Sequence, residues 1–205
     1  MDSCALTDHG VMYGVIDFYK EAKKQGIHPI LGSEIYLTEN MEEKSLQKGE
    51  ARYYHIVLLA ENETGFHNLM KLVSLGFTEG YYYKPRVDYA VLEKYHEGII
   101  ALSACLAGEV SRALRQSDYE KAKKAALRYR DIFGEENFFL EMQDHGYPEQ
   151  KLVNQGMLRL HEETGIPLVA TNDIHFLNEE DAEAHDRLIC LSTGKDLNDP
   201  RRMRY

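Results

Sequence analysis

The sequence predicts an α/β fold in which parallel strands are joined by helical crossovers. Short apolar runs bounded by turn residues alternate with segments of helical periodicity along almost the whole chain. Repeated strand–helix units are typical of parallel sheets, and strands buried on both faces read as continuous apolar runs. With about six strands, both a doubly wound sheet and a barrel remain open, and both place functional groups at the carboxyl ends of the strands.

The first half of the chain alternates strands and helices in a clear order. Apolar residues spaced for one helical face follow the first strand, and Gly26 is a typical helix stop before the second strand. The predicted elements are a strand at 3–6, a helix at 11–25, strands at 27–32 and 55–60, and a helix at 64–76.

The second half repeats the alternation with recognisable helix starts. Ser117 and Glu120 form a capping-box pattern, Pro148 suits the first turn of a helix, and Asn178 precedes an acidic first turn as a candidate cap. The predicted elements are strands at 98–104, 137–142 and 166–171 and helices at 108–115, 117–134, 148–165 and 178–194.

Composition limits the classes of protein that this chain can be. Its 205 residues suit one large domain or two small ones, and no apolar run of about 18 residues predicts a membrane span. Three scattered cysteines and no signal-peptide pattern favour a reducing cytoplasm. The net charge of -10 excludes nucleic-acid binding by overall positive charge, so any such contact needs a local patch, bound cations or a neighbouring domain.

Groups able to ligate a cation follow nearly every predicted strand. Because the carboxyl ends of neighbouring parallel strands meet at one edge, these side chains are expected to converge. Mixed histidine and carboxylate ligands suit zinc, manganese or iron. The groups are Asp8 with His9, Glu34, Cys105, Glu141 with His145, and Asp173 with His175.

Each of these groups also has a plainer interpretation. Asp173 and His175 can form a capped turn with a surface histidine, Cys105 can be a buried structural cysteine, and Glu34 can cap a turn. His145 can be a solvated loop residue. His55 precedes its apolar run rather than following it, so spacing alone does not favour it as a ligand.

The segment "YYYKPR" at 81–86 is the most basic and aromatic part of an acidic chain. We interpret its tyrosines as core and rim packing rather than as a base-stacking platform. Lys84 and Arg86 are the best candidates for phosphate contacts.

Several stretches closely resemble the polymerase and histidinol phosphatase (PHP) domain family. The resemblance is strongest to the form at the N-terminus of bacterial replicative DNA polymerase III alpha subunits, and it covers almost the whole chain in the right order. It implies a distorted barrel of about seven strand–helix units with up to three divalent metal ions at the strand ends. The matching stretches are 4–37, 53–77, 81–88, 99–110, 140–150 and 169–197.

The resemblance implies a set of metal ligands, with Asp8 next to them in a supporting position. It raises the expectation for His55 and leaves His145 unassigned. The implied ligands are His9 of "TDH", Glu34 of "GSE", His55 of "YYH", Cys105 of "SAC", and Asp173 with His175 of "NDIH".

One departure from the family pattern concerns a His-x-His motif on the family's first strand. No such pair occurs in the 205 residues, so we expect the first strand–helix region and about three ligands to be missing and this chain alone to be inactive. We expect residues 1–194 to form the PHP domain and 195–205 to begin the connection toward polymerase domains.

The resemblance leaves three functions open. The first is a PHP domain of a replicative polymerase with an ancestral metal-dependent phosphoesterase or 3'-5' exonuclease site, whose partners are DNA and the remaining domains of the alpha subunit, which carry nucleotidyl transfer. The second is a structural module that docks a proofreading exonuclease subunit. The third is a free-standing phosphatase, against which the polymerase-like "LSTGKDL" segment argues.

Overall fold

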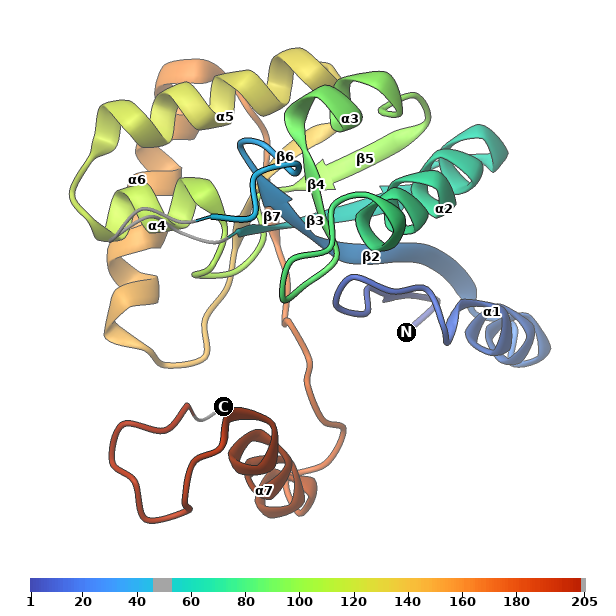
Figure 1. Cartoon of the computed structure of the whole chain (residues 1–205), viewed down its shortest axis with the longest axis vertical. Coiled ribbons are helices and arrows are strands. Elements are labelled where there is room, and N and C mark those ends of the chain that lie inside the picture. The colour runs from blue at the N-terminus through green and yellow to red at the C-terminus, as the bar shows by residue number, and fades with distance from the viewer. Residues whose placement is uncertain (46–52, 204–205) are drawn as a thin grey trace.

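The computed structural model describes residues 1–45 and 53–203 and contains a seven-stranded sheet with helices packed around it (Figure 1). The strands are β1 (Ser3–Leu6), β2 (His28–Thr38), β3 (Tyr54–Ala60), β4 (Arg86–Asp88), β5 (Ile99–Leu102), β6 (Phe138–Met142) and β7 (Leu168–Ala170). The helices are α1 (Val15–Lys24), α2 (Glu63–Thr78), α3 (Tyr89–Lys94), α4 (Glu109–Arg115), α5 (Tyr119–Phe133), α6 (Pro148–Thr164) and α7 (Asp181–Thr193).

The sheet is mixed and curls into a half-barrel. Its strand order is β1-β2-β3-β5-β6-β7, with β4 beside β2. The pairs β1–β2, β2–β4, β5–β6 and β6–β7 are parallel, whereas β3 runs antiparallel to both β2 and β5. The α/β prediction is therefore confirmed as a distorted barrel, and the all-parallel expectation was wrong for β3. Apolar periodicity reports burial and carries no information on strand direction.

The two faces of the sheet carry different sets of apolar residues because successive side chains point to opposite sides. Ile35, Leu37, Ile56 and Leu58 belong to the large core under the helices. Val57 points to the other face, where it joins a smaller cluster with buried residues of β5 and the segment after it. The inner, concave face is therefore apolar in its middle, and the polar groups gather at its rim.

Side-chain caps position three of the helices. Asn62, Asp88 and Asp118 each accept a hydrogen bond from the backbone N–H three residues later, at 3.0–3.1 Å. The predicted cap Ser117 was wrong: its φ of 58° is left-handed, while the Asp118 carboxylate adds favourable charge at the start of α5.

Four further details differ from the sequence expectations. Asn178 is not the cap of α7, because its backbone and side-chain amides donate to Asp181 Oδ2 at 3.0 and 3.2 Å and the helix begins at Asp181. Strand β2 extends six residues further than 27–32, to Thr38, and β4 and α3 were not predicted. Strand β4 and helix α3 hold too few residues to show a period of apolar positions.

Helix α7 stands away from the sheet at the end of an extended segment (Figure 1). Its Leu188 and Leu191 side chains are 62% and 81% exposed. Within residues 1–45 and 53–203, none of the helices is long and apolar enough to cross a membrane.

Candidate metal centre

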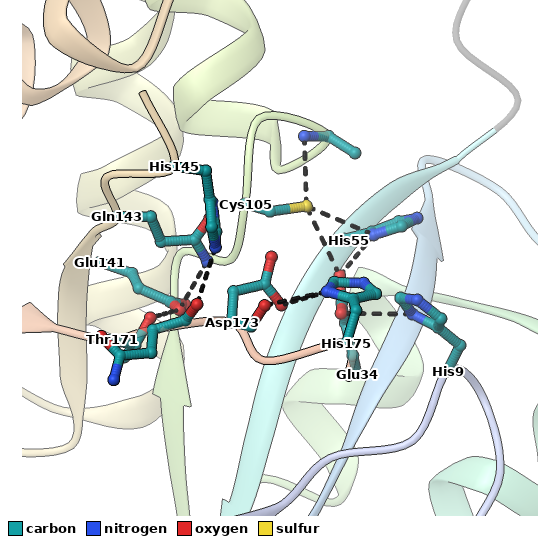
Figure 2. Close-up of polar contacts among 12 residues, drawn as sticks. His9, Glu34, His55, Cys105, Glu141, Gln143, His145, Thr171, Asp173 and His175 are labelled. Atoms are coloured by element: carbon teal, nitrogen blue, oxygen red, sulfur yellow. Dashed lines mark hydrogen bonds and ion pairs between the residues drawn. The ribbon is translucent and has the colours of Figure 1, made fainter. Parts of the chain in front are cut away.

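A buried carboxylate held between two histidines lies at the rim of the inner face. Glu34, in β2, is only 5% exposed. Its Oε2 lies 3.3 Å from His9 Nδ1, and its Oε1 is bonded by His55 Nδ1. One ligand atom from each of these three residues falls within 4.8 Å of the others (Figure 2). Three donors at this spacing can hold one metal ion.

Backbone contacts fix the His9 loop against β2. The Glu34 N–H donates to the Asp8 carbonyl at 3.0 Å, and the Gly10 N–H donates to the Glu34 carbonyl at 2.8 Å. The Ser33 hydroxyl bonds the carbonyls of Asp8 and Val11 at 3.0 and 3.1 Å. The loop after β1 therefore continues the parallel pairing as far as His9, which places its ring beside Glu34. Asp8 supports this arrangement through its carbonyl oxygen.

The antiparallel direction of β3 explains the position of His55. His55 pairs with Tyr36 in the β2–β3 register, two residues from Glu34 and on the same face. Because β3 runs opposite to its neighbours, its first residues lie where the parallel strands end. A histidine that precedes its apolar run thus reaches the same rim as the groups that follow theirs.

Cys105 approaches the same carboxylate from the segment after β5. Its sulfur lies 3.7 Å from both Glu34 Oε1 and His55 Nδ1, and it accepts a hydrogen bond from the Ala107 N–H at 3.5 Å. Burial, reinforced by the charge of Glu34, raises the pKa of the Cys105 thiol to about 12. A bound metal ion would be needed to make it a thiolate.

Asp173 and His175 come from the loop after β7. The Asp173 backbone has a left-handed φ of 44°, and His175 Nδ1 lies 2.9 Å from the Asp173 carbonyl oxygen and 3.9 Å from its carboxylate. The His175 ring centroid is 6.0 Å from that of His9. Burial raises the pKa of Asp173, and the charge of Glu34 acts in the same direction. This loop therefore closes the rim on the side of His9.

The protonation of the central pair follows from these contacts. Burial alone would raise the pKa of Glu34, but hydrogen bonds from His55 and His9 lower it to about 2. The hydrogen bond to Glu34 raises the pKa of His9. Glu34 is thus ionised at neutral pH, as a metal ligand must be.

Two residues of the β6 end, Glu141 and His145, were candidate ligands by their position at a strand end, although the family resemblance assigns a ligand role to neither. Glu141 is buried beside Gln143 and Thr171. His145 accepts from the Gln150 side-chain amide at 3.0 Å through Nδ1, so its Nε2 carries the proton and donates to the Asn172 carbonyl at 2.7 Å. The sequence signal for both was their position after a strand.

The basic and aromatic segment splits into two parts. Arg86 was wrongly predicted as a phosphate contact: it is 1% exposed and donates to the carbonyls of Gly80, Met41 and Glu43 at 3.0–3.2 Å. Lys84 is exposed, and its Nζ lies 5.5 Å from the centre of the Tyr36 ring at the rim.

The tyrosines of this segment are more open than expected. Tyr81 and Tyr83 are 54% and 61% exposed, so they do not belong to the core; they pack at the surface, where the Tyr81 ring stacks on Phe77 and the Tyr83 ring meets Tyr82 edge-on.

Comparisons with known proteins identify the family of this chain. The family model described as "PHP domain" matches residues 1–145. The chain is 44% identical over 205 residues to the DNA polymerase III subunit alpha of Borreliella burgdorferi and 44% identical to that of Treponema pallidum, in each case covering 100% of this chain and 18% of the relative. It is 42% identical to the DNA polymerase III subunit alpha of Deinococcus radiodurans, covering 98% of this chain and 15% of the relative. The chain thus spans less than a fifth of the length of these relatives, and it belongs to the PHP domain family.

Proposed function

We propose that this chain forms a phosphoesterase-type metal centre in the PHP region of a protein similar to the replicative DNA polymerase III alpha subunit. The observation that carries the proposal is the buried Glu34 carboxylate. Its Oε2 faces His9, and its Oε1 contacts both His55 and Cys105. A buried carboxylate in this setting needs a cation or protonated partners.

The donor set fits divalent metal ions. Imidazole, carboxylate and thiol together suit zinc, manganese or iron rather than calcium or magnesium. His9, Glu34, His55 and Cys105 would hold one ion, and Asp173 with His175 would add ligands from the loop after β7. The family resemblance implies up to three ions in a complete cluster.

The chain's own residues would prepare the centre for a phosphate ester. Metal ions in such a cluster would activate water and neutralise charge on the scissile phosphate. Glu34 stays ionised because its pKa is about 2 and orients both histidines through their Nδ1 atoms. Lys84 supplies an exposed positive charge at the rim, where it would attract a phosphate group.

The substrate class follows from the relatives. A polymerase offers the centre the 3' end of a DNA strand, so 3'-5' exonuclease activity is the corresponding reaction, while nucleotidyl transfer would reside in other domains. The net charge of -10 means that most of the DNA contacts would come from those domains. The 205 residues lack a His-x-His pair, so turnover by the chain alone is expected to be low.

A docking role is the second candidate, and helix α7 favours it. Leu188 and Leu191 expose large apolar side chains to solvent. Apolar residues that lie together on a surface are typical of a site that another protein surface covers. The remaining polymerase domains are the first choice for that surface, and a proofreading exonuclease subunit is the second. We place the boundary toward those domains after Gly194, which ends α7 in a left-handed conformation.

Binding of a reaction product separates the two roles. Deoxyadenosine monophosphate should bind the manganese-loaded chain in a calorimetric titration, and should not bind after chelation or in a Glu34→Gln variant. Lys84→Met should weaken this binding without changing the amount of manganese bound. If the manganese-loaded chain does not bind the nucleotide in this titration, the phosphoesterase proposal is refuted and the docking role remains.

A further inference from the structure

Glu141 is a buried carboxylate with one oxygen satisfied and the other not. It lies in β6 and is 5% exposed. Its Oε1 accepts hydrogen bonds from the Thr171 hydroxyl and from Gln143 Nε2, the latter at 2.9 Å. Its Oε2 is fully buried and has no hydrogen-bond partner in the part of the chain that the structure describes. A buried acceptor without a partner is costly, and a charged one is more so.

The surroundings of Glu141 make its charge harder to accommodate. Burial raises its pKa, and the nearby carboxylates of Asp173 and Glu34 act in the same direction. The same three carboxylates raise the pKa of Cys105. No ion pair to Glu141 occurs among the residues described, whereas the Asp173 carboxylate lies 3.9 Å from His175 Nδ1.

Strand pairing brings Glu141 and Asp173 to neighbouring positions. Glu141 pairs with Val169 in the parallel β6–β7 register. The hydrogen bond to Thr171 then ties the Glu141 carboxylate to a residue two positions before Asp173. Figure 2 shows Glu141 on one side of Asp173 and His175, with Glu34, on the other. Asp173 thus lies between the unpartnered carboxylate and the histidine-rich centre.

We propose that Glu141 Oε2 and the Asp173 carboxylate bind a divalent cation at a position next to the Glu34 centre. The proposal rests on the proposed metal-dependent function and adds Glu141 as a ligand. Two carboxylates with water molecules are a hard, oxygen-only donor set, so this position favours manganese or magnesium over zinc.

The hydrogen bonds to Glu141 Oε1 support this role. Thr171 and Gln143 both donate to Oε1, which fixes the carboxylate and leaves Oε2 without a partner among the described residues. Outer contacts of this kind orient a metal-ligating carboxylate. A cation held here would also fix the Asp173 loop, whose left-handed backbone needs support from its surroundings.

A Glu141→Gln variant tests the proposal, with Glu109→Gln as the matched control. Glutamine keeps the size of the side chain and an oxygen to accept from Thr171, but it removes the charge. Glu109 is a second buried glutamate, 7% exposed, whose Oε2 accepts from the hydroxyls of Tyr89 and Tyr129 and which contacts none of the metal-ligand candidates in the described residues.

The readouts are manganese equivalents bound, measured by equilibrium dialysis, and melting temperatures with and without chelator. In chelator, Glu141→Gln should melt at or above the parent temperature, because an uncompensated buried charge has been removed. With manganese it should bind one equivalent fewer, or bind that equivalent at least about tenfold more weakly. Glu109→Gln should melt lower in both conditions and bind the parental amount.

The manganese count decides the outcome. If Glu141→Gln binds the parental number of equivalents with parental affinity, Oε2 faces a water molecule or a proton and the proposal is overturned. A Glu34→Gln variant measured in parallel distinguishes failure of the Glu141 ligand role from failure of the metal centre itself. Loss of metal in Glu34→Gln but not in Glu141→Gln refutes only the ligand role of Glu141, whereas no loss in either variant refutes the metal centre itself.

Discussion

Replacing Glu34 with glutamine removes the charge around which the centre is built. In the metal-free chain, Glu34 accepts hydrogen bonds from His9 and His55, and these contacts lower its pKa from 4.5 to about 2. A shift of this size corresponds to at most about 3 kcal/mol of the free energy of unfolding. Total stabilities of domains are only about 5–15 kcal/mol, so the loss is measurable. For a chain of this length it lowers the melting temperature by roughly 6–12 °C.

The loss of stability in Glu34→Gln depends on pH, and its direction follows from the pKa shifts of Glu34 and His9. The folded-state pKa of Glu34 is depressed, so its contribution is present above pH 4.5 and is lost as the pH falls toward 2. The folded-state pKa of His9 is raised, so its contribution is present below pH 6.5 and is lost as the pH rises through the folded-state value. The difference between parent and variant is therefore expected to be largest between pH 4.5 and 6.5.

The assay is thermal unfolding followed by circular dichroism at pH 3, 5.5 and 8 in the presence of chelator. Chelator is essential because a metal ion would replace the protons that the histidines share with Glu34. Equal melting temperatures of parent and Glu34→Gln at pH 5.5 would refute the reasoning, as would a difference that grows at pH 8.

Three further predictions concern the loop, the basic segment and a close backbone contact. In Asp173→Ala/His175→Ala, chelator should lower the melting temperature less than in the parent, because only the ion held by the Glu34 centre remains; an effect as large as in the parent would show that this pair holds no metal. Arg86→Met should cost about 2–4 kcal/mol in urea unfolding because two buried carbonyls and one partly buried carbonyl lose their donor, whereas Lys84→Met should change stability by less than about 0.5 kcal/mol; equal costs would contradict the assignment. Gly65→Ala should destabilise by about 3 kcal/mol or more, since its Cβ would lie 1.7 Å from the Gly98 carbonyl oxygen; an unchanged urea midpoint would contradict that contact.

Most helices and strands were readable from the sequence, because burial imposes a period on apolar residues, whereas the short β4 and α3 were not. Helix α5 was expected at 117–134 and is found at Tyr119–Phe133. The direction of a strand was not readable, and for this reason spacing alone disfavoured His55 as a ligand. The family resemblance identified His55 as a candidate ligand, which apolar periodicity could not do.

The site was predicted less completely than the fold, since contacts between distant segments leave no local signal. Arg86 looks like any exposed arginine in its own segment, and only the fold brings the carbonyls of Met41 and Glu43 to its side chain. Glu141 was noticed as a strand-end carboxylate, but its unpartnered oxygen depends on Thr171 and Gln143 occupying the other one.

The antiparallel pairing of β3 with β2 makes the centre sensitive to insertions and deletions as well as to substitutions. His55 faces Glu34 only because it stands opposite Tyr36 in that register. Removing one residue between His55 and Ala60 would turn the histidine to the helix-covered face while leaving every ligand in the sequence. The spacing within this strand is thus constrained as well as its residues, and a homologue that retains each ligand type but is one residue shorter or longer here would have this histidine on the other face.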